Sequence, residues 1–195
     1  MEIVVKEKPS DVSFEAIQTI IAEAHKSNEK AGMLFATARQ SPEKLAAKIG
    51  ENGACFVAYC DGALAGTMSV SFRKLKYWYC DDDVAIIKLG GVKPEFKGRG
   101  LASALLKQCL ETAANRGVNV VVCDTAEQND AMGNMLLKYG FQRVDYCKYA
   151  ANNFYTAVYV KRLDGSTYSR WYCGLRYCLK KIYIRWKYKP NEGRV

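Results

Sequence analysis

One stretch, Val92–Ala102, constrains the fold of this chain more than any other part of its sequence. A largely apolar run over residues 84–92 leads into it and predicts a buried strand, while apolar residues at helical spacing follow it from Leu101 onward. The stretch therefore predicts a turn from a strand into a helix. Gly98 and Gly100 favour such a turn, because glycine adopts backbone conformations that other residues avoid and lets a ligand approach the main chain.

The same turn has the chemistry of an anion site. The first N–H groups of a helix have no partner within the helix, so phosphate oxygens can accept their hydrogen bonds. Lys97 and Arg99 add two positive charges there, and Ala102 keeps the first helical turn thin. A glycine-rich turn with basic residues can also be plain turn chemistry, so the pattern alone is a weak signal.

Two nucleotide-binding loops match the stretch poorly. A P-loop needs Lys-Ser or Lys-Thr after its last glycine, and here Leu101-Ala102 follows Gly100. The dinucleotide fingerprint needs a third glycine, and this chain has Ser103 instead. Asp124 lies near the distance at which that fold places its acidic residue, so the dinucleotide interpretation stays a minor alternative.

The run V-K-P-E-F-K-G-R-G-L-A resembles the acetyl-CoA loop of the GNAT N-acetyltransferase superfamily, which reads Val-x-Pro-x-(Tyr/Phe)-(Arg/Gln)-x-x-Gly-x-(Gly/Ala). Lys97, Gly100 and Ala102 fall on the signature positions, with Lys97 in place of the usual Arg or Gln. Asn129, followed by Gly140-Phe141, matches a second block of that family. The resemblance implies a GNAT-like α/β fold, in which helices flank a central mixed β-sheet.

The resemblance also implies an activity and a cofactor. We expect an acyl-CoA-dependent N-acyltransferase that moves acetyl from acetyl-CoA, the acyl donor, to a primary amine by direct attack. The acceptor is expected to be a small-molecule or peptide amine, and no metal is expected. The residues that the resemblance assigns to cofactor binding are Gly91, Val92, Lys97, Gly98, Arg99, Gly100, Leu101, Ala102 and Asn129.

Asp124 is the candidate general base. In relatives with a Glu five residues before the family Asn, that Glu is the base, and Asp124 holds this position here. The chain from Val118 to Cys123 reads as a strand buried on both faces, and a carboxylate at its end can have a raised pKa. Alternatively, Asp124 only binds substrate or caps the next helix. Asn129 can likewise be the N-cap of its own helix.

The proton donor is harder to assign. Many relatives carry a Tyr seven residues after the Asn that protonates the coenzyme A thiolate, and this chain has Leu136 there. Leucine cannot donate a proton. Tyr139, one helical turn away, is the substitute candidate, although it can equally pack beside Phe141. This departure motivates a rival hypothesis, a coenzyme A-binding module without turnover.

The remaining patterns predict alternating elements. In a GNAT-like fold residues 28–40 would border the acceptor site, and His25 reads as a surface or helix-end residue. Asp81-Asp82-Asp83 reads as an acidic turn, either solvated or receiving a cationic acceptor. Expected strands lie at residues 2–7, 54–60, 63–74, 118–123, 141–149 and 154–160, and expected helices at about 11–27, 42–49, 100–116 and 129–138.

Residues 164–195 differ from the rest. They carry eight Lys and Arg against two acidic residues, in a chain of net charge +9. We therefore divide the chain into a GNAT-like domain, 1–163, and a basic, aromatic-rich C-terminal tail, 164–195. One helical stripe of the tail is apolar and comprises Trp171, Leu175, Cys178, Leu179, Ile182 and Trp186. The favoured destination of the stripe is protein, its own domain or a second subunit in a homo-oligomer. A membrane surface or nucleic acid is the less favoured partner, through which the tail would act as an adaptor.

The composition sets outer bounds. No apolar run is long enough to span a membrane, and the N-terminus lacks the pattern of a signal peptide, so a cytoplasmic protein is expected. The eight cysteines form no C-x-x-C pair and the chain has one histidine, which argues against a zinc site.

Overall fold

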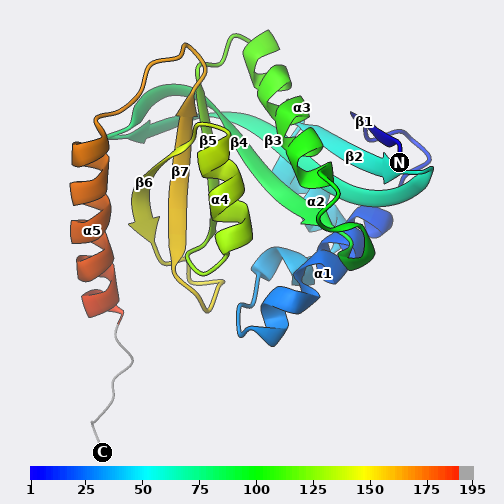
Figure 1. The fold of residues 1–195 in the computed structure, drawn as a ribbon, viewed down its shortest axis with the longest axis horizontal. Helices are drawn as coiled ribbons and strands as arrows, with labels where there is room; N and C mark the ends of the chain where they lie inside the picture. The colour runs from blue at the N-terminus through cyan, green and yellow to red at the C-terminus, as the bar shows by residue number, and fades with distance from the viewer. Residues whose placement is uncertain (189–195) are drawn as a thin grey trace, which may run out of the picture.

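The computed structural model describes residues 1–188, without the side chains of Asp81 and Asp82, and shows a mixed α/β fold built on a seven-stranded sheet (Figure 1). The order across the sheet is β1-β2-β3-β4-β5-β7-β6. The strands are β1 (Ile3–Glu7), β2 (Ala54–Cys60), β3 (Ala63–Tyr77), β4 (Cys80–Val92), β5 (Val120–Ala126), β6 (Gln142–Cys147) and β7 (Thr156–Arg162). The α-helices are α1 (Phe14–Lys30), α2 (Pro42–Ile49), α3 (Leu101–Asn115), α4 (Asp130–Lys138) and α5 (Arg170–Lys187).

The centre of the sheet is a strand–helix–strand unit. Strands β4 and β5 are parallel and joined through α3, whereas every other neighbouring pair is antiparallel. This mixed sheet flanked by helices confirms the predicted fold class.

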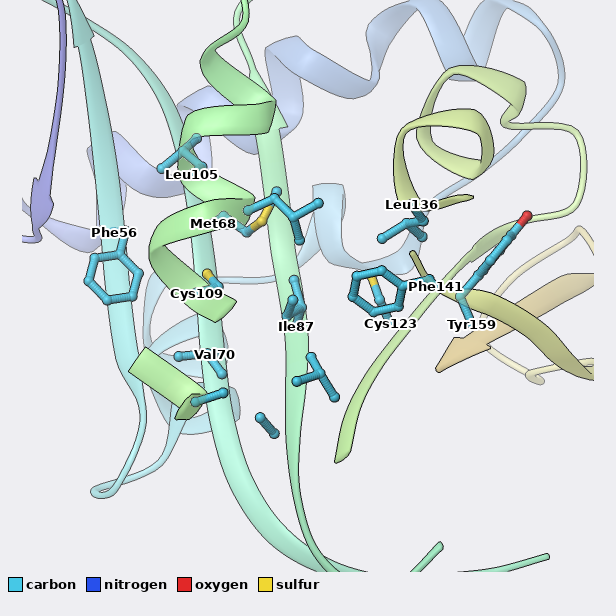
Figure 2. Packing of buried hydrophobic residues seen from close by; sticks show 14 of the residues in the cluster. Phe56, Met68, Val70, Ile87, Leu105, Cys109, Cys123, Leu136, Phe141 and Tyr159 are labelled. Atoms are coloured by element: carbon cyan, nitrogen blue, oxygen red, sulfur yellow. The ribbon is translucent and has the colours of Figure 1, made fainter. Parts of the chain in front are cut away.

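Helices cover both faces of the sheet. Phe56 of β2 packs in one cluster with Leu105 and Cys109 of α3 (Figure 2). Its neighbour Val57 packs in another cluster with Ile17 of α1 and with α2. Because successive side chains of a strand point to opposite faces, α3 lies on one face and α1 and α2 lie on the other. Helix α4 shares the α3 face, since Leu136 belongs to the same cluster as Phe56.

The hairpin between β3 and β4 corrects one prediction. Tyr77 pairs with Cys80, so the turn is formed by Trp78 and Tyr79. The predicted acidic turn, residues 81–83, is wrong because its backbone is part of β4 and pairs with β3. The side chains of Asp81 and Asp82 lie outside the described residues.

Helix α5 packs along β6, the edge strand of the sheet (Figure 1). Its docked side chains are Cys173, Tyr177 and Ile184, all of which are buried. Ion pairs add to this contact: Lys180 binds Asp145 at 2.7 Å, while Lys181 and Arg185 both bind Glu127. The tail therefore packs on its own chain, but not through the predicted apolar stripe, whose large side chains are exposed: Trp171, Leu175, Leu179, Ile182 and Trp186.

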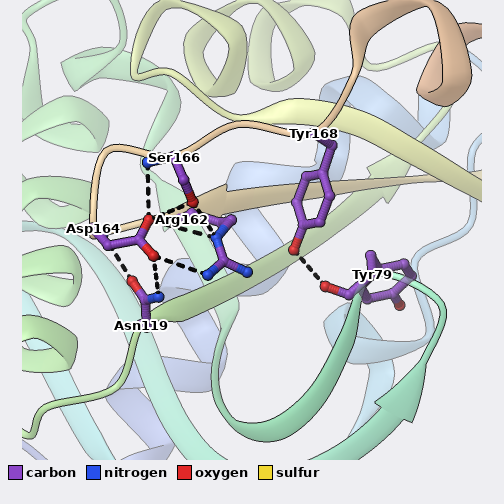
Figure 3. Close-up of polar contacts among 6 residues, drawn as sticks. All are labelled: Tyr79, Asn119, Arg162, Asp164, Ser166 and Tyr168. Atoms are coloured by element: carbon purple, nitrogen blue, oxygen red, sulfur yellow. Dashed lines mark hydrogen bonds and ion pairs between the residues drawn. The ribbon is translucent and has the colours of Figure 1, made fainter.

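A polar network fastens the segment that leads from β7 to α5 (Figure 3). Asp164 accepts hydrogen bonds from Asn119 Nδ2 at 2.6 Å and from Arg162 Nη2 at 2.8 Å, and Ser166 donates to it as well. These donors hold the pKa of Asp164 below its ordinary value. The hydroxyl of Tyr168 donates to the carbonyl of Tyr79 in the β3–β4 hairpin, so this segment is tied to the sheet before α5 begins.

Candidate active site

The site begins where two parallel strands separate. Strands β4 and β5 pair only from Val84 to Ile87 on β4, and no further pairs join them toward Val92. Beside this point the β3–β4 register shifts, so that β4 carries one residue more than β3, and Leu89 there has φ 55°. Such a β-bulge bends the strand that contains it. The bulge accounts for the divergence of β4 from β5.

A cavity of about 940 Å³ occupies the gap. It is lined by residues from both faces of the sheet: the turn before α3, the start of α4, the α1–α2 region and the loop after β6. The cavity is therefore continuous from the glycine-rich turn to Asp124. Of the predicted cofactor residues, those that line it are Gly91, Val92, Lys97, Gly98, Leu101, Ala102 and Asn129, whereas Arg99 and Gly100 belong to the turn without lining the cavity.

The glycine-rich turn is open toward solvent. Gly100 is the N-cap residue of α3 with φ 90°, and Gly98 has φ 78°. A Cβ added at either residue would meet nothing within 4 Å. The first turn of α3 is therefore accessible to a ligand. Gly91 has a different role, because a Cβ there would lie 3.0 Å from Ala24 Cβ and would push α1 away from β4.

Lys97 was expected to bind the cofactor, but its side chain makes hydrogen bonds to α1. Its Nζ donates to the carbonyl oxygen of Ala24 and to Ser27 Oγ, both at 3.1 Å. This side chain therefore fastens the turn to the end of α1, where it also borders the cavity.

Asn129 is the N-cap of α4, as one of the two alternatives predicted. Its Oδ1 accepts from the Met132 N–H at 3.4 Å, and its Nδ2 donates to Thr125 Oγ1 at 3.0 Å. Contact with the pantetheine arm remains a prediction for the same side chain, which also lines the cavity.

Asp124 lies on β5 beyond the last residue paired with β4. Its Oδ2 accepts a hydrogen bond of 2.8 Å from the Tyr149 hydroxyl. The side chain is exposed to the space of the cavity although protein surrounds it on most sides. Burial raises the pKa of Asp124 above its ordinary value, against the opposing effects of Tyr149, Lys88 and other cations. The structure thus places a carboxylate with a raised pKa at the cavity wall.

Two further residues were not predicted for the cavity wall. Tyr149 follows β6 and reaches Asp124 across the sheet. The ring of His25 stacks on Phe35 at 4.3 Å, and burial, together with the charge of Lys97, lowers the pKa of His25 to about 4. His25 is therefore neutral at pH 7. No local pattern marks either residue, because each reaches the site from a separate element.

Neither Leu136, at the position of the family's proton-donating Tyr, nor Tyr139, the substitute candidate, is among the lining residues of the cavity. Leu136 is fully buried in the core cluster with Phe141 and Tyr159 (Figure 2). Tyr139 ends α4, packs against the same cluster, and does not line the cavity that contains Asp124. A proton-donating role for Tyr139 stays a prediction without support from the geometry.

Two loops meet beside the cavity. The N–H of Leu34 donates to Asn153 Oδ1 at 2.7 Å, and the N–H of Ala36 donates to Asn152 Oδ1 at 3.1 Å. Asn153 Nδ2 donates in turn to the carbonyl of Gly32 at 2.7 Å. The segment between α1 and α2, which was expected to border the acceptor site, is thereby joined to the β6–β7 loop beside the cavity.

Comparison with known proteins agrees with this geometry. Residues 14–141 match the model of the acetyltransferase (GNAT) family. Among solved structures, the ribosomal-protein-S18-alanine N-acetyltransferase from Escherichia coli has 16% sequence identity and a TM-score of 0.62, over 86% of this chain and 97% of that chain. NAA60 from Arabidopsis thaliana, in complex with a bisubstrate analogue, has 17% identity and a TM-score of 0.65, over 85% and 100%.

A GNAT family acetyltransferase from Elizabethkingia anophelis, with acetyl-CoA bound, has 16% identity and a TM-score of 0.59, over 83% of this chain and 98% of that chain. At such identities the likeness concerns the fold. The family match extends over well more than half of the sequence. The chain therefore belongs to the GNAT acetyltransferase family and is a transferase of that kind.

Proposed function

We propose that this protein transfers an acyl group, most simply acetyl from acetyl-CoA, to a primary amine by direct attack, with Asp124 as general base. The observation that carries the proposal is the continuous cavity, which has Gly98 at one end and Asp124 at the other. Donor and acceptor can therefore meet in one space.

The donor end fits acetyl-CoA. The first turn of α3 presents unpaired N–H groups beside Gly100, where no Cβ fills the space, and this suits the pyrophosphate. Gly91 and Val92 lie beyond the last residue of β4 that pairs with β5. Their main-chain groups on that edge are therefore suited to hydrogen-bond the pantetheine amides. The bound donor would supply an activated thioester carbonyl.

The acceptor end supplies the proton chemistry. Asp124 would take one proton from the incoming ammonium, and the amine lone pair would then attack the thioester carbonyl carbon. The C–S bond would break as the thiolate leaves, and the attacking nitrogen would lose its remaining extra proton to the thiolate or to solvent. Tyr149 would orient the carboxylate through its 2.8 Å hydrogen bond. An acid is not required, because a thiol with an ordinary pKa of about 8.5 is a tolerable leaving group. A Tyr139→Phe variant tests whether Tyr139 contributes: unchanged turnover is expected, and a large loss would restore it as the acid.

The test of the proposal is release of free thiol from acetyl-CoA with a panel of small-molecule and peptide amines. We expect turnover with at least one class of amine. Binding of coenzyme A by calorimetry without turnover of any amine would favour the rival, a binding module, which is motivated by the leucine at position 136. No helix within residues 1–188 is long and apolar enough to cross a bilayer. We keep a cytoplasmic location as part of the proposal, supported by eight free cysteines.

A further inference from the structure

The acceptor end of the cavity has an excess of positive charge. Lys48 from α2, Arg73 from β3 and Lys88 from β4 line it, and Asp124 is the one carboxylate among the lining residues that the structure describes. None of the ion pairs found within residues 1–188 uses any of the three cations. They are therefore available to an anion from outside.

The positions of these cations are set by the fold. Lys88 Nζ donates to the carbonyl of Lys48 at 2.9 Å, which fixes it at the end of α2. Burial lowers the pKa of Lys88 to about 8, with further contributions from the charges of Arg73 and Lys48. The positive charges of Lys48, Arg73 and Lys88 thus repel one another, and a bound anion would relieve this repulsion.

Two uncharged groups in the same cavity also point to a polar ligand. Thr156 is 2% exposed, and its Oγ1 has no hydrogen-bond partner within the described residues. Oε1 of Gln40 is a second buried atom that has no hydrogen-bond partner within the described residues. Both residues line the cavity, and buried polar atoms normally have partners.

We propose that the acceptor is an amine that also carries an anionic group, a carboxylate or a phosphate, which lies against Lys88, Lys48 and Arg73 while its amino group lies at Asp124. This inference rests on the proposed function. The cations attract such a substrate and repel one that bears only positive charge, so they determine specificity in both directions.

The test compares matched acceptors. An α-amino acid is paired with its amide, and an aminoalkyl phosphate with the corresponding amino alcohol, with rates corrected for the fraction of deprotonated amine. We expect kcat/KM to favour the anionic member of at least one pair by about tenfold or more, and the preferred pair distinguishes carboxylate from phosphate. Preference for the neutral member in both pairs would overturn the inference and leave the transferase function standing. Turnover of no amine at all would overturn both.

Variants then assign the preference to these side chains. Lys88→Met should lower the anionic-to-neutral ratio of kcat/KM about fivefold or more. Arg73→Met should act in the same direction, without removing the Lys88 bond to α2. Lys44→Met is the matched control, because Lys44 is an exposed lysine of α2 outside the cavity. An unchanged ratio in both the Lys88 and the Arg73 variant would contradict the inference.

The outer face of α5 carries a second inference, independent of the cavity. Its large side chains are exposed, with Trp171 at 75%, Ile182 at 67% and Trp186 at 71%. Their spacing places them on one face of the helix, opposite to the docked residues Tyr177 and Ile184. An apolar face of this size rarely contacts only water.

The charge of α5 indicates what covers this face. The helix carries six Lys and Arg and no acidic residue. Three of these cations are bound to Asp145 of β6 and to Glu127 just after β5. Arg176 stacks on Trp78 at 4.7 Å, and no ion pair within residues 1–188 uses Arg170 or Lys187. A symmetric contact between two copies would place this cationic helix against itself, where like charges repel.

We propose that the outer face of α5 lies in the surface of an anionic lipid bilayer. Its apolar residues would enter the interface, where tryptophan is favoured, and Arg170 and Lys187 would meet anionic headgroups. This inference replaces the homo-oligomer through the tail as the favoured destination of the stripe.

The full chain is tested by cosedimentation with vesicles of phosphatidylcholine, with and without phosphatidylserine. We expect binding to the mixed vesicles and weaker binding in high salt. The double variant Trp171→Ala/Trp186→Ala should bind about tenfold more weakly or worse, whereas Leu137→Ala, an exposed apolar residue of α4, serves as the matched control and should not. Absence of binding to mixed vesicles would overturn the inference. So would a dimer in light scattering that the double variant abolishes.

Discussion

Replacing Asp124 by asparagine gives the sharpest test of the mechanism. Asp124→Asn keeps the size and polarity of the side chain but removes the proton acceptor at the cavity wall. The Tyr149 hydroxyl can still donate, now to the amide oxygen, so the local hydrogen bond is retained. Coenzyme A affinity should change little, because the glycine-rich turn is at the other end of the cavity.

The expected loss follows from the role of a general base. Positioned bases contribute about 10²–10⁴-fold, which corresponds to roughly 2.7–5.4 kcal/mol of transition-state stabilisation at about 1.36 kcal/mol per decade. The assay is thiol release from acetyl-CoA at saturating donor. Turnover of the variant close to that of the original protein across the pH range would show that Asp124 is not the base.

The pH profile adds a readout that a structural role would not move. A base must be deprotonated, so kcat/KM should fall as the pH falls through the pKa of Asp124, which burial raises. The bond from Tyr149 acts in the opposite direction and lowers that pKa. Tyr149→Phe should therefore move the acid limb to higher pH. An acid limb of the pH profile that stays in place in Tyr149→Phe, or that persists unchanged in Asp124→Asn, would refute the assignment of Asp124 as the base.

Three further outcomes are expected. Gly100→Val should weaken coenzyme A binding in calorimetry tenfold or more, about 1.4 kcal/mol. Gly117→Val is the control for backbone strain, since Gly117 has φ 69° and equally open space at the far end of α3. Equal affinity in both variants would contradict the loop assignment. Leu136→Tyr should lower the melting temperature, because overpacking a core costs about 1–3 kcal/mol, without raising kcat; a gain in kcat would show that a tyrosine there reaches the donor. Truncation after Leu163 should also lower the melting temperature, because it removes the buried Tyr177 and Ile184, and an unchanged value would show that α5 does not stabilise the sheet.

The glycine-rich turn, which is the proposed donor end, could be predicted from the sequence because its determinants are local. One run of residues supplies the strand, the glycines and the helix start, and Gly98 and Gly100 both have the left-handed conformation that a glycine permits. The N-cap Asn129 was also accessible to local reasoning. Element boundaries shifted by a few residues, as at α1, where Ser13 is the N-cap.

The side chains at the proposed acceptor end could not be predicted in this way. Lys48, Arg73, Lys88 and Tyr149 come from four different elements and meet only through the sheet topology. The bulge that opens the cavity has a leucine, Leu89, at positive φ, which no residue preference indicates. Such a feature depends on tertiary packing.

The C-terminal tail shows a different limit of prediction from sequence. Its apolar stripe predicted a docking face, yet the helix docks through the opposite face. Ion pairs contribute to this choice, because Lys180 binds Asp145 of β6 and Lys181 binds Glu127 just after β5, both on the docked side of the helix. A periodicity of apolar residues cannot show that carboxylates elsewhere in the chain will select the more polar face.

The bulge also supports direct transfer of the acyl group rather than transfer through a covalent acyl-enzyme intermediate. By separating β4 from β5 it joins the α3 face, which the glycine-rich turn leads into, to the α1 and α2 face, where Asp124 and the neighbouring cations lie. A cysteine, Cys123, does line this passage, but it is 3% exposed. Burial and the neighbouring charge of Asp124 hold the pKa of the Cys123 thiol well above its ordinary value, so it stays protonated and is a poor nucleophile. If donor and acceptor meet in this cavity, as we propose, Cys123 is not an activated nucleophile between them, and direct attack of the amine on the thioester is the mechanism that we expect.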